Sequence, residues 1–281
     1  MSIRLDGKAL AAEIKAEVKK EADILRENGK KPTLAVILVG DNQASAVYVR
    51  NKKKDCEECG FESLSYELSA DFGEEKLIGL VEELNQNREV DGILVQLPLP
   101  KGYDERKVIN AISPEKDVDA FHPVNAGKLL IGEEGFLPCT PAGIIALLEK
   151  YEIDVTGKRC VVIGRSNIVG KPMALLLLKK NGTVTVAHSR TENLADLTRE
   201  ADILVSAVGK AGFVTGDMVR EGAVIVDVGM NRNEAGKLCG DVVFDECEKK
   251  ASYITPVPGG VGPMTRAILM KNTLRAAKNN L

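Results

Sequence analysis

The fold is decided by the stretch Val161-Val162-Ile163-Gly164-Arg165-Ser166-Asn167-Ile168-Val169-Gly170-Lys171-Pro172. An apolar run over residues 160–163 predicts a strand, and a helical pattern follows over residues 169–178. Glycine lets the chain turn sharply and lets a phosphate approach peptide N–H groups, and the start of a helix adds positive partial charge. The stretch therefore predicts a nucleotide-phosphate site. Its spacing, G-x-S-x-x-x-G, differs from the usual G-x-G-x-x-G, so an ordinary loop between strand and helix remains the alternative.

The rest of the chain repeats this alternation of strand and helix. Apolar runs of strand length occur over residues 34–39, 92–95, 160–163, 184–187, 203–206 and 223–228, with a further short strand over 61–66. Helical patterns cover residues 10–28, 44–59, 74–85, 142–151 and 264–278. Alternating strands and helices indicate an α/β protein with parallel sheets and right-handed crossovers.

The alternation loosens between residues 113 and 141, where four prolines occur, so we place a domain hinge in or just beyond this stretch. We expect two domains with a cleft between them. The first is an N-terminal α/β domain with a mostly parallel sheet over residues 1–138, joined by the closing helix 266–281. The second is a Rossmann-type domain over residues 139–265.

The choice of nucleotide depends on the end of the second strand of that Rossmann-type domain, where an acidic residue usually binds the ribose of NAD. Here the sequence reads His188-Ser189-Arg190-Thr191, without a carboxylate. Ser189 and Arg190, together with Arg165, suit the extra phosphate of NADP. The alternative is that both arginines are solvated surface charges.

Composition narrows the class of protein further. The chain has 281 residues, 44% of them hydrophobic and 28% charged, which is typical of globular proteins. A net charge of -3 gives no reason to expect a nucleic-acid or membrane partner. No apolar run approaches the roughly 20 residues that span a bilayer, and residues 1–6 lack the apolar core of a signal peptide. We therefore expect a cytoplasmic protein.

Candidate reactive groups fall in the first domain. Ser45, Tyr48 and Lys52 stand at i, i+3 and i+7, which places them on one face of a helix that begins where the strand over 34–39 ends. Gln96 directly follows another strand, and ligands bind outside the carboxyl ends of parallel strands, so we expect these groups to converge. Lys52 also lies beside two further lysines, and a solvated charge run is its alternative. Tyr48 could equally be a core residue.

Cysteine and histidine are sparse and scattered. The six cysteines predict free thiols, and we interpret the C-x-x-C of Cys56 and Cys59 as structural because no second pair or redox context accompanies it. Only His122 and His188 are present, so we expect no metal site.

Five motifs together resemble the family of bifunctional methylenetetrahydrofolate dehydrogenase/methenyltetrahydrofolate cyclohydrolase. They occur in the family's order and span nearly the whole chain. One departure is Ala120, where the family usually has glycine; we expect it to tighten the turn behind Asp119 without abolishing activity. The motifs are SAVYVRNK (45–52), DGILVQLPLP (91–100), PEKDVD (114–119), GRSNIVGKP (164–172) and PVPGGVGPMT (256–265).

The resemblance implies a role for each candidate residue. Lys52 would be the central catalytic group, Tyr48 would stack against the folate, Gln96 would hydrogen-bond Lys52, and Asp119 would hold the pterin end. The remaining residues serve the cofactor and a closing loop. NADP would be bound by Gly164, Arg165, Ser166, Ser189, Arg190 and the backbone near Met230, while Pro258, Gly259 and Gly260 would close over the substrate and nicotinamide.

The implied function is one-carbon folate interconversion for purine biosynthesis, by a homodimer. The dehydrogenase step takes hydride from 5,10-methylenetetrahydrofolate to NADP, and alignment is its main requirement. The cyclohydrolase step adds water to the methenyl compound and opens it to 10-formyltetrahydrofolate. That step moves protons, for which a desolvated lysine beside a neutral amide is a suitable group. Two alternatives are an NADP-dependent dehydrogenase of small acids, such as a shikimate-type enzyme, and an NADP-sensing protein without turnover.

Overall fold

The computed structural model describes residues 2–280, apart from the side chains of Gln43 and Ala44. The chain divides into two compact α/β units with parallel main sheets, as predicted. We call residues 12–137 with 266–281 the Lys52 unit, and residues 1–11 with 138–265 the Gly164 unit. The division differs from the predicted boundaries at the N-terminus, because β1 (Ile3–Arg4) pairs in parallel with β11 (Tyr253–Ile254). Two-residue strands carry no periodicity that a sequence pattern could reveal.

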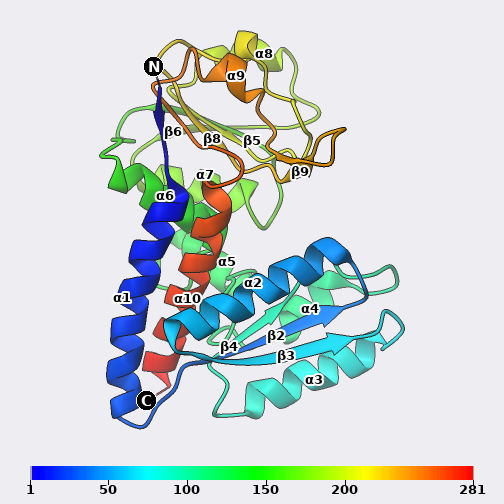
Figure 1. Ribbon diagram of the computed structural model, residues 1–281. Coiled ribbons are helices and arrows are strands. Elements are labelled where there is room, and N and C mark those ends of the chain that lie inside the picture. The colour runs from blue at the N-terminus through cyan, green and yellow to red at the C-terminus, as the bar shows by residue number, and fades with distance from the viewer. Residues whose placement is uncertain (1, 281) are drawn as a thin grey trace. The chain divides into compact units, whose positions relative to one another are not determined.

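The Lys52 unit is built on a three-stranded parallel sheet in the order β3 (Glu62–Leu68), β2 (Thr33–Val39), β4 (Gly92–Val95). Every residue of β2 is buried, as its continuous apolar run predicts. Alternate residues Ala35, Ile37 and Val39 pack with α3 (Glu74–Gln86) and α4 (Glu105–Ala111). Helix α2 (Gln43–Cys59) covers the opposite face (Figure 1). The carboxyl ends of β2 and β4 therefore lie at one edge, where α2 begins and Gln96 follows.

Three further helices complete the Lys52 unit. Most of α1 (Gly7–Glu27) and α10 (Val261–Asn279) belongs to it, and both were predicted within a few residues. Helix α5 (Pro123–Ile131) was not predicted, because its proline was interpreted as an interruption. Proline is favoured at the first helical position, and here His122 Nδ1 accepts a hydrogen bond from Val124 N at 3.1 Å to cap the helix.

The Gly164 unit contains a six-stranded parallel sheet in the order β1-β11-β8-β7-β5-β6. The strands β5 (Arg159–Ile163), β6 (Thr183–Ala187), β7 (Ile203–Ser206) and β8 (Val224–Asp227) confirm the predicted series. One face packs with α8 (Leu194–Arg199), the short helix η1 (Gly216–Met218) and α9 (Phe244–Cys247). The other is covered by α6 (Cys139–Lys150) and α7 (Gly170–Lys179) (Figure 1). A small antiparallel hairpin, β9 (Asn231–Arg232) with β10 (Leu238–Cys239), follows β8.

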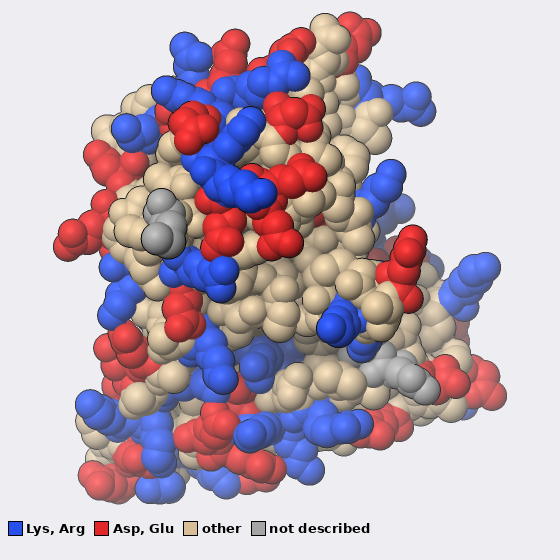
Figure 2. Space-filling view, turned by 45° about the horizontal axis from the view of Figure 1, so that its top comes forward, with Lys and Arg blue, Asp and Glu red and all other residues tan. Residues whose placement is uncertain are grey.

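The surface has mixed charge. Figure 2 shows Lys and Arg interspersed with Asp and Glu over the face in view, in keeping with the small net charge of -3. Within residues 2–280, none of the helices combines the length and the apolar character needed to cross a membrane.

Candidate functional site

Helix α2 carries the predicted reactive face of the Lys52 unit. Its start is fixed by Asn42, whose Oδ1 accepts a hydrogen bond from Ser45 N at 3.1 Å, and it ends at Gly60, which has a φ of 75°. The helical spacing puts Ser45, Tyr48 and Lys52 on one face, as predicted. Ser45 and Lys52 are buried, and Tyr48 is half-buried. The alternative that Lys52 is a solvated charge is wrong, because only 7% of the residue is exposed.

Lys52 and Gln96 form the predicted hydrogen bond, with Nζ donating to Oε1 over 3.0 Å. Gln96 is held from two sides, since its backbone N donates to Ile37 O at 2.8 Å and its Nε2 donates to Leu97 O at 2.8 Å. The second bond orients the amide, because the nitrogen is occupied by a carbonyl and the oxygen must then face the ammonium. A neutral acceptor thus contacts a buried lysine, which is the arrangement the sequence predicted.

A buried carboxylate, Asp55, anchors the same helix one turn further on. Its two oxygens accept from Lys15 Nζ at 2.8 Å and from Arg266 Nη1 at 2.6 Å, and its side chain is 2% exposed. Burial raises the pKa of Tyr48, and the charge of Arg266 acts in the opposite direction. The phenol therefore stays protonated near neutral pH. Sequence reasoning missed the pair of Asp55 with Arg266, because Arg266 lies far from α2 along the chain.

The loop of Asp119 is held against β4 by a second buried aspartate. Ile93 N donates to Lys116 O at 2.8 Å, and the carboxylate of Asp117 accepts from His122 N and Asn125 Nδ2, each at 2.8 Å. Burial raises the pKa of Asp117, and these hydrogen bonds oppose the rise. Asp119, half-buried, lies in the turn that follows, which a hydrogen bond from Ala120 N to Asp117 O closes at 3.0 Å. Sequence reasoning identified Asp119 but missed Asp117, which holds its loop in place.

Ala120, the departure from the family pattern, has a φ of 60° and is buried. This left-handed conformation explains why glycine is usual here, because a Cβ atom costs about 1 kcal/mol or more in that region. The loop is tied down nearby, where Asn272 Nδ2 donates to Val118 O at 2.8 Å.

The turn after β5 has the geometry of a phosphate-binding turn. Gly164 has a φ of 129°, and a Cβ atom there would lie 2.4 Å from Ala207 O. A Cβ atom on Gly170 would lie 2.2 Å from Gly164 O, so both positions require glycine. The hydroxyl of Ser166 accepts from Val169 N at 3.2 Å and Gly170 N at 3.3 Å, which caps the start of α7. Arg165 and Ser166 are exposed at this helix start and can meet a phosphate.

The loop after β6 lies beside this turn, since Gly164 N donates to Ala187 O at 2.9 Å. His188 organises the loop: its backbone N donates to Thr191 Oγ1 at 2.9 Å, and its Nδ1 accepts from Arg190 N at 3.2 Å. Ser189 and Arg190 are left exposed. A hydroxyl and a guanidinium next to Arg165 fit a 2′-phosphate, so the residues present suit NADP.

Two more predicted positions lie in the Gly164 unit. Met230 follows β8 and is 44% exposed. The loop of Pro258, Gly259 and Gly260 contacts the start of α1, where Lys8 N donates to Gly259 O at 2.9 Å. Gly259 has a φ of 112°, a conformation that favours glycine.

Other candidate groups do not join these sites. Cys56 and Cys59 are buried free thiols whose pKa burial raises to about 12, which disfavours the reactive thiolate. Among residues 2–280, the His, Cys, Asp and Glu side chains form no group of three able to hold a metal ion.

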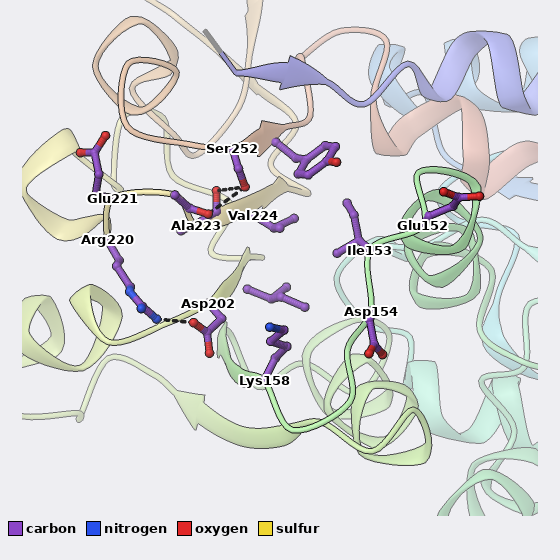
Figure 3. A pocket seen from close by; sticks show the side chains of 13 residues that line it. Glu152, Ile153, Asp154, Lys158, Asp202, Arg220, Glu221, Ala223, Val224 and Ser252 are labelled. Atoms are coloured by element: carbon purple, nitrogen blue, oxygen red, sulfur yellow. Dashed lines mark hydrogen bonds and ion pairs between the residues drawn. The ribbon is translucent and has the colours of Figure 1, made fainter.

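A cavity of about 330 Å³, shown in Figure 3, opens at the amino ends of β5, β7 and β8. Its lining includes the ion pair of Arg220 with Asp202 and carries both signs of charge. None of the predicted site residues lines it. Nucleotides bind at the carboxyl ends of parallel strands, so this cavity is not the cofactor site.

The two units together define a class of protein: a two-domain α/β enzyme with a dinucleotide turn in one unit and a buried lysine paired with an amide in the other. Comparison with known proteins identifies the family. The tetrahydrofolate dehydrogenase/cyclohydrolase catalytic domain matches residues 5–119, and the NAD(P)-binding domain of the same family matches residues 138–281. The chain belongs to the tetrahydrofolate dehydrogenase/cyclohydrolase family.

Individual relatives support this assignment. The bifunctional protein FolD of Campylobacter hominis is 59% identical over 277 residues, covering 99% of this chain and 98% of the relative. The crystal structure of the bifunctional FolD enzyme from Campylobacter jejuni has a TM-score of 0.98 at 52% identity, with all of both chains covered. The Trypanosoma brucei FolD enzyme, solved with NADP and an inhibitor, has a TM-score of 0.95 at 42% identity, covering 99% of this chain and 98% of that one. The predicted family, enzyme class and NADP cofactor are confirmed, and a small-acid dehydrogenase is set aside.

Proposed function

We propose that this chain oxidises 5,10-methylenetetrahydrofolate with NADP and hydrolyses the methenyl product to 10-formyltetrahydrofolate, using the residues described above. The observation that carries the proposal is the hydrogen bond of the buried Lys52 with the neutral, half-buried Gln96. An aspartate or glutamate in place of Gln96 would hold the lysine in its charged form. A neutral amide does not favour the charged form in this way, so it lets the lysine exchange a proton more readily.

In the Lys52 unit, each residue has a distinct task in this proposal. Lys52 takes a proton from the attacking water and gives it to the folate nitrogen whose bond to the carbon breaks, while the second proton of that water leaves to solvent as the formyl carbonyl forms. Gln96 keeps the amine aimed at the reacting carbon, since its own orientation is fixed by Leu97 O. The half-buried ring of Tyr48 stacks against the folate, and its phenol stays neutral. Asp119 accepts hydrogen bonds from the pterin.

In the Gly164 unit, Gly164, Arg165 and Ser166 hold the phosphates, with Ser189 and Arg190 at the 2′-phosphate and the backbone of Met230 beside the nucleotide. When bound there, NADP supplies the hydride acceptor. Pro258, Gly259 and Gly260 complete the binding of substrate and nicotinamide. The exposed start of α7 and the arginines beside it support this assignment.

We infer a homodimer in the cytoplasm that serves purine biosynthesis and has neither nucleic acid nor membrane as a partner. Family membership supports these points, and size-exclusion chromatography with light scattering tests the dimer.

A coupled assay tests the function directly. Purified protein is given 5,10-methylenetetrahydrofolate and NADP, and the absorbances of NADPH and of the methenyl compound are followed together. We expect NADPH to form in step with oxidation, while the methenyl compound remains low because it is hydrolysed. Formation of NADPH with small hydroxy acids but not with the folate would overturn the proposal.

A further inference from the structure

Asp241, a buried carboxylate that follows β10, has no role in the site described so far. It is 0% exposed and accepts hydrogen bonds from five donors. The donors are Ser206 Oγ at 3.2 Å, Val208 N at 2.7 Å, Gly209 N at 3.2 Å, Lys210 N at 2.9 Å and Asn231 Nδ2 at 2.9 Å. They come from the end of β7 and the loop after it, and from the start of β9, which follows the loop after β8.

We propose that Asp241 is a positioning residue for the cofactor, which fixes the backbone of these two loops and thereby sets the affinity for NADP. The inference rests on the proposed function, since it takes NADP to bind at the turn of Gly164 and beside Met230.

The loop after β7 reaches the cofactor turn directly. Ala207 N donates to Ile163 O at 2.8 Å, and Ala207 O is the atom that leaves no room for a Cβ on Gly164. The next three residues all point their N–H groups at the carboxylate of Asp241. All three residues are exposed, so the loop has little other packing to hold it. Asp241 therefore determines the backbone that flanks the turn.

The loop after β8 is held from both sides of Met230. On one side, Gly229 N donates to Asp227 Oδ1 at 2.9 Å, and on the other, Asn231 Nδ2 donates to Asp241. Asp227 also accepts from the backbone N of Asp241 and Val242, each at 2.9 Å. The two aspartates thus form one buried network around the loop that carries Met230.

Two positions beside this network require glycine. A Cβ atom at Gly229 would lie 2.2 Å from Asp241 Oδ1, and one at Gly240 would lie 1.8 Å from Asp227 Oδ2. Their absence of side chains lets the backbone close around each carboxylate, so this part of the chain is shaped for the two aspartates.

An amide cannot replace the carboxylate of Asp241 without loss, because backbone N–H groups, which can only donate, face both of its oxygens. In Asp241→Asn, the NH2 group must face either Lys210 N or the backbone N of Val208 and Gly209. At least one backbone donor would then lose its acceptor, and hydrogen bonds to an ionised acceptor are among the stronger ones. The exposed loop would turn toward water, away from the cofactor turn.

The test measures the Kd for NADP and, separately, hydrolysis of added methenyl compound, which needs no hydride transfer. For Asp241→Asn we expect NADP to bind about tenfold more weakly or worse, with cyclohydrolase kcat/KM within about twofold of the wild type. Asp245→Asn, an exposed aspartate on α9, is the matched control and should change neither value. If Asp241 only kept the protein folded, NADP binding and cyclohydrolase activity would both fall, together with the folded fraction.

Asn231→Ala provides a second variant that keeps the carboxylate and removes one donor. We expect NADP binding to weaken about two- to fivefold, and this variant decides the matter if Asp241→Asn does not fold. Unchanged NADP binding in a folded variant would overturn the role of Asp241 but leave the proposed function standing. An equal loss of NADP binding and of methenyl hydrolysis would do the same. Failure of the wild-type protein to bind NADP would overturn the proposed function, and this inference with it.

Discussion

Gln96→Glu perturbs the reactive pair most directly. It keeps the shape of the side chain and puts a carboxylate oxygen 3.0 Å from Lys52 Nζ. At that distance and an effective dielectric constant of about 20, the attraction is about 5 kcal/mol. Burying the new carboxylate takes back part of this, and about 1.5 to 4 kcal/mol remains in favour of the charged lysine. Lys52 is 7% exposed, so solvent screens little of the effect.

The assay is the pH dependence of methenyl hydrolysis by the purified variant. If a neutral lysine is the base, the rising limb of the profile moves up by about one to three pH units, and the rate at pH 7 falls by about 10- to 1000-fold. The Kd for NADP should be unchanged. Gln86→Glu, at the exposed end of α3, is a control with the same change of charge. A profile that stays at its wild-type position would show that a neutral Lys52 is not the base.

Three further predictions concern other parts of the chain. Arg165→Gln should raise KM for NADP by about tenfold and leave KM for NAD unchanged; an equal effect on both would exclude a 2′-phosphate contact. Asp119→Ala should raise KM for the folate while NADP binding stays constant, and an unaltered folate KM would count against a pterin contact. Burial raises the pKa of Asp227 to about 6, above its value in the unfolded chain. The folded protein therefore holds this proton more tightly, and the resulting stabilisation is complete below about pH 4 and lost as the pH rises through 6. Denaturant unfolding should therefore show Asp227→Asn gaining about 2 to 3 kcal/mol relative to wild type between pH 4 and 7, and a constant difference would contradict this.

The sequence predicted most of the fold because long buried strands and amphipathic helices have clear periods. The run over β2 and the strand–turn–helix at Gly164 are examples. Very short elements escaped prediction: β1 and β11 have two residues each, and their pairing is what assigns the N-terminus to the Gly164 unit. Helix α5 was missed because a proline that begins a helix resembles one that breaks it.

The candidate site was predictable where a side chain stands at a recognisable place, such as the end of a strand for Gln96. The supporting carboxylates were not, because their partners are distant in sequence. Asp55 binds Arg266, and Asp241 binds backbone N–H groups of a loop more than thirty residues earlier. Backbone donors have no sequence signature, so only the folded chain reveals what these aspartates hold.

Lys52→Met separates the roles of the two units most directly, because methionine keeps an unbranched side chain as far as Cε and removes the amine. The measurement compares the rate of methenyl hydrolysis with the Kd for NADP in the same preparation. We predict that hydrolysis falls by about 100-fold or more while NADP binding stays within about twofold of the wild type. Hydrolysis at the wild-type rate would show that Lys52 does not move the proton, and would contradict the account.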